Sequence, residues 1–441
     1  MGVNEPQIIM DILFSSFSDA FSALQSVVSA VLDVWFIIFP PLFYFLFKLL
    51  WKLRVQEDYN SKLKWVLLEL IPPREIEQSP LPMESIFAGF AGVIKTLTMA
   101  EIWIKGEIPI SFSLEIASTE GNIHLYVRTQ AGFRDLVEAN FYAQYPNIEI
   151  IEVPDYTQSV PYIIPNKDWD LWGTDYVFAK DDLYPIRTYK YFEESVTGKM
   201  IDPLGGLIET MAKIGPGQHL WLQYIVTPFK EDWYDIGQKT IDEFLGKIEK
   251  EKMGVFGQLL HDIVDVLKNI GGGLLAREVE FKSAEEKKEK EEAPVEFRLT
   301  PGEKEVLKAL EANLGKQMFK IRMRHVYIGR KEVFHKPTGV SAFIGAIKQF
   351  NDFNLNSFKP DDNSKTYANY LFTEERLRYR QRRILRRYIK RDIDPPNTRM
   401  LLSTEELATV FHIPDMAVIA PTMVRVAAKR GGAPVNLPIQ E

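Results

Sequence analysis

Two short runs of alternating apolar and polar residues, separated by a turn sequence, lie between residues 109 and 153. In residues 112–116 and 123–127 every second side chain is apolar, which is the period of a strand with one buried face. The sequence STEGN between them supplies a glycine and an asparagine, which adopt the positive φ of a hairpin turn at low cost. Apolar residues at helical spacing follow and end at Pro146, before one more apolar run. The stretch therefore predicts strand, turn, strand, helix and strand, without a catalytic pair or metal-ligand spacing.

The sequence before this stretch extends it into a familiar order of elements. Residues 64–73 are typical of a strand ended by two prolines, and residues 83–97 have the apolar face of a helix. The order is then βαββαβ, the split βαβ or ferredoxin-like module, over residues 62–153. A similar order of helix, turn and strand recurs after Asp202, so we expect a second, duplicated module at residues 201–350.

The fold class predicted for the whole chain is α+β, with tandem ferredoxin-like modules. Residues 154–200, rich in Pro, Asp, Tyr and Trp, are expected to form an irregular connection. A charged low-complexity run predicts an insertion at residues 249–297 within the second module. Residues 351–441 are expected to form a basic, helical C-terminal segment with a polar tail, in which Ser403 and Glu406 predict a capping box.

Residues 1–58 are expected to form a membrane anchor. Residues 34–51 are apolar apart from Lys48, and a bilayer core requires about 20 such residues. Basic residues follow this run and none precedes it, so the positive-inside rule places the N-terminus outside and the bulk of the chain in the cytoplasm. An amphipathic helix is expected upstream, and the predicted location is the cell membrane with a single pass. The residues assigned to the transmembrane helix and its interfaces are Val34, Trp35, Pro40, Pro41, Tyr44 and Trp51.

The net charge of −7 conceals an uneven distribution along the chain. Residues 298–441 carry 26 Lys and Arg against 15 Asp and Glu, a net charge of +11, whereas residues 1–297 carry 27 against 45, a net charge of −18. Such a split indicates a partner for the basic half, or contact between the two halves. The basic residues are densest in one predicted helix, at Arg376, Arg378, Arg380, Arg382, Arg383, Arg386, Arg387, Lys390 and Arg391.

This helix is the candidate binding surface, for nucleic acid or for a partner protein. Arginines interleaved with aromatic residues, here Tyr379 and Tyr388, suit phosphate backbones. Pairing with the acidic half of the chain, and contact with anionic lipid, are the alternatives. A second basic stripe is expected on the outward face of a strand, at Lys320, Arg322 and Arg324.

Residue patterns that would support enzymatic chemistry are missing from the sequence. With no cysteine, the chain has no disulfide, no Cys-ligated zinc and no thiol catalysis. None of the Gly-Lys pairs has the upstream glycine and the following Ser or Thr of a P-loop. No two of the six histidines have metal-ligand spacing, and the adjacent acid pairs would point to opposite faces of a strand. We therefore expect no catalytic residue, no cofactor and no metal, and so no enzyme.

Two longer signatures resemble a known group of proteins. The first covers residues 112–153 and continues with IDPLGGLIETMAKIGPGQHLWLQYIVTP at 201–228; the second is LLSTEELATVFHIPDMAV at 401–418, followed by RGGAPVNLP at 430–438. They resemble the membrane-anchored, non-ATPase N-terminal region associated with bacterial type IV secretion and conjugation ATPases of the HerA/FtsK class, an uncharacterised domain. Because the sequence has no Walker motif, the motor that this resemblance implies would be a separate polypeptide.

Two functional hypotheses follow from the sequence. The first is a non-catalytic, membrane-anchored platform of a translocation system, in contact with lipid and forming homo-oligomers, that docks a separate hexameric ATPase. The alternative is a membrane-tethered nucleic-acid-binding protein that acts through the Arg-rich helix at residues 376–391. Salt distinguishes them, because binding to phosphates weakens log-linearly with salt concentration whereas docking through apolar area does not.

Overall fold

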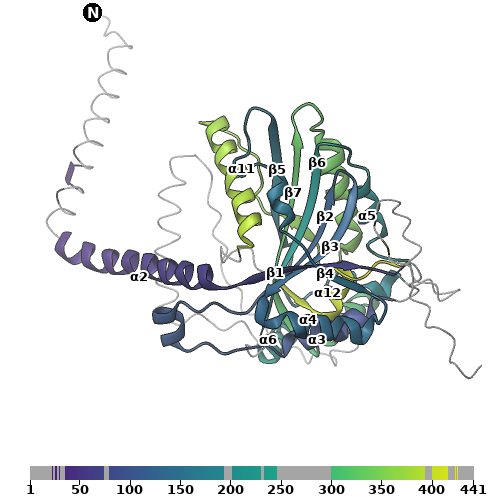
Figure 1. The fold of residues 1–441 in the computed structure, drawn as a ribbon. Coiled ribbons are helices and arrows are strands. Elements are labelled where there is room, and N and C mark those ends of the chain that lie inside the picture. The colour runs from purple at the N-terminus through teal and green to yellow at the C-terminus, as the bar shows by residue number, and fades with distance from the viewer. Residues whose placement is uncertain are drawn as a thin grey trace, which may run out of the picture. The chain divides into compact units, whose positions relative to one another are not determined.

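In the computed structural model the described residues are 35–73, 79–192, 201–229, 233–245, 299–392 and 400–415, with a few isolated positions outside these ranges (Figure 1). The chain divides into two units. The first comprises residues 1–64 and 95–109, and the second comprises residues 65–94 and 110–441.

The first unit contains α2 (Trp35–Lys62) and a π-helical turn, η1 (Glu101–Lys105), that packs against it. The indole Nε1 of Trp51 donates a hydrogen bond to the carbonyl oxygen of Trp103 at 2.8 Å. Gly106 follows η1 with a φ of 70°, and a Cβ at this position would lie 2.2 Å from the carbonyl oxygen of Val55. Glycine is therefore required where the chain leaves the turn beside α2.

Within the described residues, no helix combines the length and the apolar character needed to cross a membrane. The predicted transmembrane helix at residues 34–51 is therefore wrong, and so is the single-pass location in the cell membrane that depended on it. The apolar run of α2 is interrupted at Lys48, and the same helix continues through charged residues to Lys62, whereas a bilayer core needs about 20 apolar residues in succession. Trp35, Pro40, Pro41, Tyr44 and Trp51 all belong to α2, while Val34 and most of the upstream segment expected to be amphipathic lie outside the described residues.

The second unit is built on one nine-stranded sheet in which every pair of neighbouring strands is antiparallel (Figure 1). The predicted α+β class is thus confirmed. The strand order is β4-β1-β3-β2-β6-β7-β5-β8, and β9 pairs with one end of β7. The strands are β1 (Trp65–Ile71), β2 (Phe112–Thr119), β3 (Asn122–Gln130), β4 (Glu149–Glu152), β5 (Trp169–Phe178), β6 (Gln218–Pro228), β7 (Met318–Arg330), β8 (Phe358–Pro360) and β9 (Met400–Ser403).

Two βαββαβ units share this sheet. The first consists of β1, α3 (Leu81–Ala91), β2, β3, α4 (Arg134–Gln144) and β4. The second repeats the order with β5, α5 (Gly205–Ala212), β6, β7, α10 (Phe343–Ile347) and β8, and its strands follow the same spatial order from the opposite edge. The units meet where β2 pairs with β6, so what the sequence presented as tandem modules forms one continuous sheet.

The second βαββαβ unit begins earlier in the chain than expected, because its first strand, β5, lies in the segment of residues 154–200 that was predicted to be irregular. Its sequence contains Asp170, Gly173 and Asp175, which disfavour strands and favour turns. Both Gly173 and Asp175 lie in close tertiary contact with other parts of the chain. A Cβ at position 173 would lie 3.2 Å from side-chain atoms of Ile384, and Asp175 is a fully buried partner of an arginine. Tertiary contacts therefore overrode the local preference of this segment.

The strands β6 and β7 are joined by a long connection rather than a hairpin. Its described part contains α6 (Trp233–Phe244) and α9 (Pro301–Leu314), which pack together on a small apolar core of their own. The charged insertion predicted at residues 249–297 lies outside the described residues.

The two faces of the sheet are covered differently. One face carries the main apolar core, beneath α3, α4, α5, α10 and α12 (Thr404–Val410). The other face is covered by α11 (Thr373–Lys390) and the loop around residues 155–164, over a smaller apolar cluster. The capping box predicted for α12 is confirmed, since Ser403 and Glu406 each accept a hydrogen bond from the backbone N–H of the other.

Candidate functional site

A row of polar residues crosses the sheet on the face beneath α11. Each member lies directly opposite the next on a neighbouring antiparallel strand, so all of the side chains project from the same face. The row is centred on the β2–β6 pair that joins the two βαββαβ units. From β1 to β5 its members are Glu69, Tyr126, Glu115, Gln223, Arg324 and Asp175.

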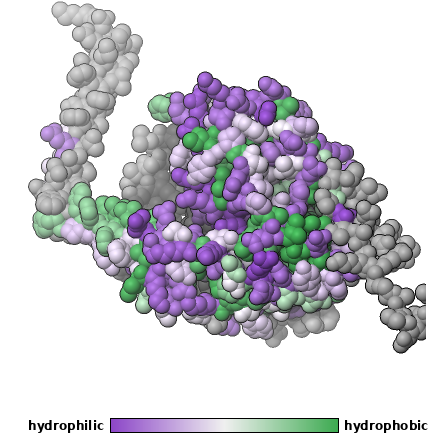
Figure 2. Space-filling model, viewed as in Figure 1, coloured by the Kyte–Doolittle hydropathy of each residue, from purple (hydrophilic) through white to green (hydrophobic). Residues whose placement is uncertain are grey.

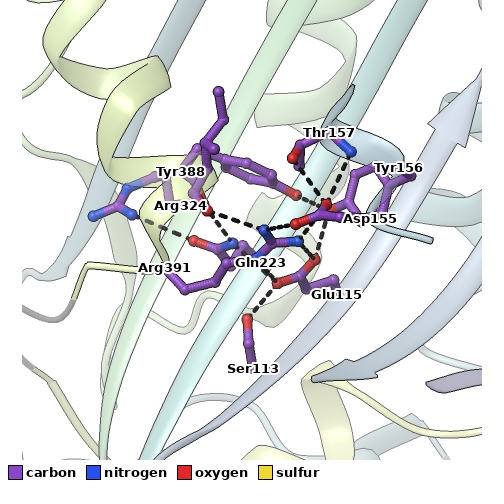
Figure 3. Close-up of polar contacts among 10 residues, drawn as sticks. Ser113, Glu115, Asp155, Tyr156, Thr157, Gln223, Arg324, Tyr388 and Arg391 are labelled. Atoms are coloured by element: carbon purple, nitrogen blue, oxygen red, sulfur yellow. Dashed lines mark hydrogen bonds and ion pairs between the residues drawn. The ribbon is translucent and has the colours of Figure 1, made fainter. Parts of the chain in front are cut away.

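Glu115, at the centre of the row, is fully buried and accepts hydrogen bonds from several side chains (Figure 3). Tyr156 Oη donates to it at 2.7 Å, and Gln223 Nε2 donates at 3.1 Å. Arg391 donates twice, from Nε at 3.0 Å and from Nη2 at 3.1 Å. Burial by itself raises the pKa of Glu115, but the charge and hydrogen bonds of Arg391, with those of Ser113 and Tyr156, hold it below its ordinary value. The carboxylate is therefore ionised and fully paired.

Arg391 also connects the end of α11 to the loop that runs over the sheet. It caps the helix with a φ of 51°, and its guanidinium binds Asp155 as well as Glu115. Asp155 in turn accepts from the backbone N–H of Thr157 at 3.0 Å and so fixes the turn that follows. Figure 3 shows the side chains of Glu115, Asp155 and Arg391 converging beside the last turn of α11.

A second buried ion pair lies within the row, at its β5 end. Arg324 Nε donates to Asp175 Oδ1 at 2.7 Å, and neither side chain is accessible to solvent. Arg387 of α11 reaches the other oxygen of Asp175 at 3.4 Å. Gln223 joins the two groups, because it donates to Glu115 and accepts from Arg324 at 3.3 Å. Two arginines predicted as a binding surface, Arg387 and Arg391, are therefore structural.

The basic stripe predicted on β7 occupies one face of the strand, but that face is not open to solvent. Arg322 is 2% exposed and Arg324 is 0% exposed, on the strand against which α11 packs. Burial lowers the pKa of Arg322 to about 10. Lys320, nearer the end of the strand, lies with its Nζ 4.6 Å from the centre of the Phe229 ring. The expectation of an outward-facing stripe is therefore corrected at Arg322 and Arg324.

The side of α11 turned away from the sheet carries the remaining basic residues. Ile384, Leu385 and Tyr388 pack onto the sheet together with the buried Arg387. Arg380 and Arg383 are partly buried, whereas the exposed members are Arg376, Arg378, Arg382, Arg386 and Lys390. Figure 2 shows hydrophilic residues, in purple, gathered over the part of the molecule where Figure 1 places α11 and the adjacent end of β5. The outer side of α11 (Tyr379, Arg382, Arg383, Arg386 and Lys390) is thus a cationic surface with one aromatic ring.

A loop rich in exposed aromatic residues precedes this helix. In the aromatic loop (residues 367–372), Tyr370 is 88% exposed and Phe372 is 74% exposed, and Tyr367 is also exposed. Tyr370 and Phe372 have φ angles of 71° and 56°, a region that residues other than glycine rarely adopt. The sequence analysis did not identify this loop as a candidate site, although four of the residues from 367 to 379 are aromatic.

Two arginines of α11 fix the shape of this loop. Arg380 Nη1 donates to the carbonyl oxygens of Asp362, Lys365 and Tyr367, at 3.2, 2.9 and 2.6 Å. Arg376 Nη1 donates to the carbonyl oxygen of Asn369 at 2.8 Å. The strained backbone is therefore held in place by charged donors rather than by an apolar core, and strain of this kind is concentrated at functional sites.

No group of three or more His, Asp or Glu is placed to hold a metal ion in the part of the chain that the structure describes. The buried carboxylates Glu115 and Asp175 are saturated by arginines and are not open to a substrate. The outer side of α11 and the aromatic loop are exposed, and both are suited to binding.

The chain belongs to a family whose function is unknown. Residues 104–425 match a family model described as a domain of unknown function (DUF8128), and this match covers most of the chain. No curated protein matches the chain.

Proposed function

We propose that this protein is a non-catalytic binding module that holds a nucleic acid on the outer side of α11. The supporting observation is the exposure of Arg382 and Arg386, which lie one helical turn apart and have no ion-pair partner among the described residues. Exposed arginines in register along a helix present repeated bidentate donors to a phosphate backbone. Tyr379, 61% exposed on the same side, adds a ring on which a base can stack.

The buried half of the basic helix supports this proposal by holding the outer half in place. The ion pairs of Arg387 and Arg391 attach α11 to the sheet over its last turns, and Gln381 Nε2 donates to the carbonyl oxygen of Leu171 at 2.6 Å. A rigidly attached helix loses little conformational entropy when it binds, so its exposed arginines are pre-organised. Docking of a motor ATPase stays a prediction from the resemblance, and a protein partner is the competing outcome of the test.

Binding to labelled oligonucleotides, measured by fluorescence anisotropy with the full chain over a range of salt concentrations, tests this proposal. The wild-type protein should bind with a log–log salt slope, to which each phosphate contact contributes about 0.7–0.9. The double variant Arg382→Glu/Arg386→Glu should bind on the order of tenfold more weakly and with a shallower slope.

A matched control separates a local effect from the change in net charge. Lys304 and Lys308 are exposed on α9, and the double variant Lys304→Glu/Lys308→Glu makes the same change in charge at a different surface. It should bind like the wild type. Absence of binding by the wild-type protein at low salt, or an equal loss in both double variants, would overturn the proposal and leave a protein partner as the explanation of the surface.

A further inference from the structure

An open cavity of about 260 Å³ lies between the aromatic loop and the first turns of α11. The residues that line it include the aromatic Tyr367 and Tyr370, the polar Asp362, Lys365 and Asn369, and Arg376 and Arg380. Binding sites for drug-sized ligands range from about 300 to 1,000 Å³, so this cavity suits a smaller group. It adjoins the helix whose outer side we propose to bind nucleic acid.

We propose that this cavity accepts an unpaired base, and that the nucleic acid bound along α11 is therefore single-stranded. This inference rests on the proposed function and adds the class of nucleic acid to it. Three kinds of group line the cavity, and each matches one part of a nucleotide. The tyrosines can stack on the flat base, the polar residues can bond to its edge, and the basic residues can bind the phosphate.

The geometry of the aromatic loop favours stacking from solution. Tyr370 is 88% exposed although it is a large apolar ring, and its φ of 71° directs the chain away from a regular turn. Arg380 holds three carbonyl oxygens of residues 362–367, and Arg376 holds that of Asn369, so the loop keeps this shape without a ligand. A base can then stack without first ordering the loop, which lowers the entropy cost of binding.

The polar groups of the cavity supply the rest of the recognition. Asn369 offers a carboxamide that can donate and accept, and Asp362 offers a carboxylate that accepts, which together match the edge of a base. Lys365 Nζ lies 5.6 Å from the centre of the Tyr367 ring and adds a positive charge at the same place. Bases in a duplex are stacked and paired, so neither their faces nor their Watson–Crick edges are available to such a cavity.

The outer side of α11 continues from this cavity. Tyr379 follows Arg376 by one helical turn, Arg382 follows Tyr379 by three residues, and Arg386 follows Arg382 by four. A strand with one base in the cavity can therefore place its following phosphates along the exposed arginines. Aromatic and cationic side chains alternate in the same way on proteins that bind single-stranded nucleic acid with little sequence preference.

The test compares three ligands of equal length with the full chain: an oligodeoxythymidine strand, a fully abasic deoxyribose-phosphate strand, and a duplex. Wild-type protein should bind the oligodeoxythymidine about tenfold more tightly than the abasic strand, which offers phosphates and no bases. Tyr370→Ala should lose this advantage and bind both strands alike, while Tyr370→Phe, which keeps the ring, should behave as the wild type.

A control aromatic residue and the arginine variant make the two proposals separable. Phe353 is fully exposed and does not line the cavity, so Phe353→Ala should leave all affinities unchanged. If Tyr370→Ala and the abasic strand make no difference while Arg382→Glu/Arg386→Glu still weakens binding, the base site is wrong and the backbone proposal stands. If the wild type binds none of the three ligands, both proposals fall.

Discussion

The buried and exposed sides of α11 carry the same residue type in opposite roles. Arg387 and Arg391 are buried against Asp175 and Glu115, where a carboxylate compensates each desolvated charge. Arg382 and Arg386 lie on the outer side of the same helix, with water as their surroundings. The comparison teaches that density of arginine in a sequence is not a measure of a binding surface, because a helix on a sheet divides its residues between packing and solvent.

The largest expected effect is on the buried side. Replacing Glu115 with alanine removes one of the two carboxylates that bind the buried guanidinium of Arg391 and leaves Asp155 as its ion-pair partner. Breaking this buried pair should cost about 3 kcal/mol of stability. Urea unfolding followed by circular dichroism measures this change. The exposed Glu374, which pairs with Arg378 across one helical turn, is the control, and Glu374→Ala should change the free energy of unfolding very little. If the two substitutions changed the free energy of unfolding equally, the distinction between a structural, buried side and an exposed side of α11 would be wrong.

A smaller effect is expected on acidification, because the pKa of Glu115 in the folded chain lies below its ordinary value of 4.5. The unfolded chain therefore takes up this proton more readily than the folded chain. The stabilisation is complete above pH 4.5 and is lost as the pH falls through the folded-state pKa. Wild-type protein should thus lose more stability on acidification than Glu115→Gln does.

Urea unfolding at a series of acidic pH values measures this difference between the wild type and the variant. Asp155→Asn should likewise lose less stability on acidification than the wild type. Hydrogen bonds and charge from Arg391 outweigh the effect of burial and lower the pKa of Asp155 too. Parallel pH profiles of the wild type and both variants would show that these carboxylates are not the groups whose protonation destabilises the fold.

The smallest effect is expected on the exposed side. The double variant Arg382→Glu/Arg386→Glu should change the free energy of unfolding by no more than about 0.5 kcal/mol, since both side chains are exposed and neither has an ion-pair partner among the described residues. Thermal unfolding of the variant beside the wild type measures it. A loss of stability comparable to that of Glu115→Ala would place these arginines among the structural residues and remove the basis of the proposed function.

Much of the fold could be predicted where local signals and tertiary contacts agree. The alternation in residues 112–127, the hairpin turn and the capping box at Ser403 are all present in the structure. The strand β5 could not be predicted, because Gly173 and Asp175 are chosen for contacts with α11 and β7 rather than for strand preference. The apolar start of α2 predicted a transmembrane helix, but the same helix continues through charged residues.

The candidate site was predicted in part. The sequence indicated the basic helix, but it could not divide its arginines, because the division depends on which side of α11 meets Glu115 and Asp175 across more than 200 residues of chain. The aromatic loop had a local signal in its composition. Its exposure and its strained backbone depend on the hydrogen bonds from Arg376 and Arg380, which only the folded chain brings about.

The amino-acid sequence alone determined the α+β class of the fold and the first βαββαβ unit, since these follow from the period of apolar residues and from turn chemistry within a few tens of residues. Of the second unit it indicated the repeated helix, turn and strand after Asp202, but not the strand β5. The tertiary structure decided that the units share one sheet through β2 and β6, and that this junction carries a buried polar row. It also decided which arginines of α11 are structural and which are free to bind. The physical reason is that burial of a charge depends on partners distant in sequence, and local pattern carries no information about them.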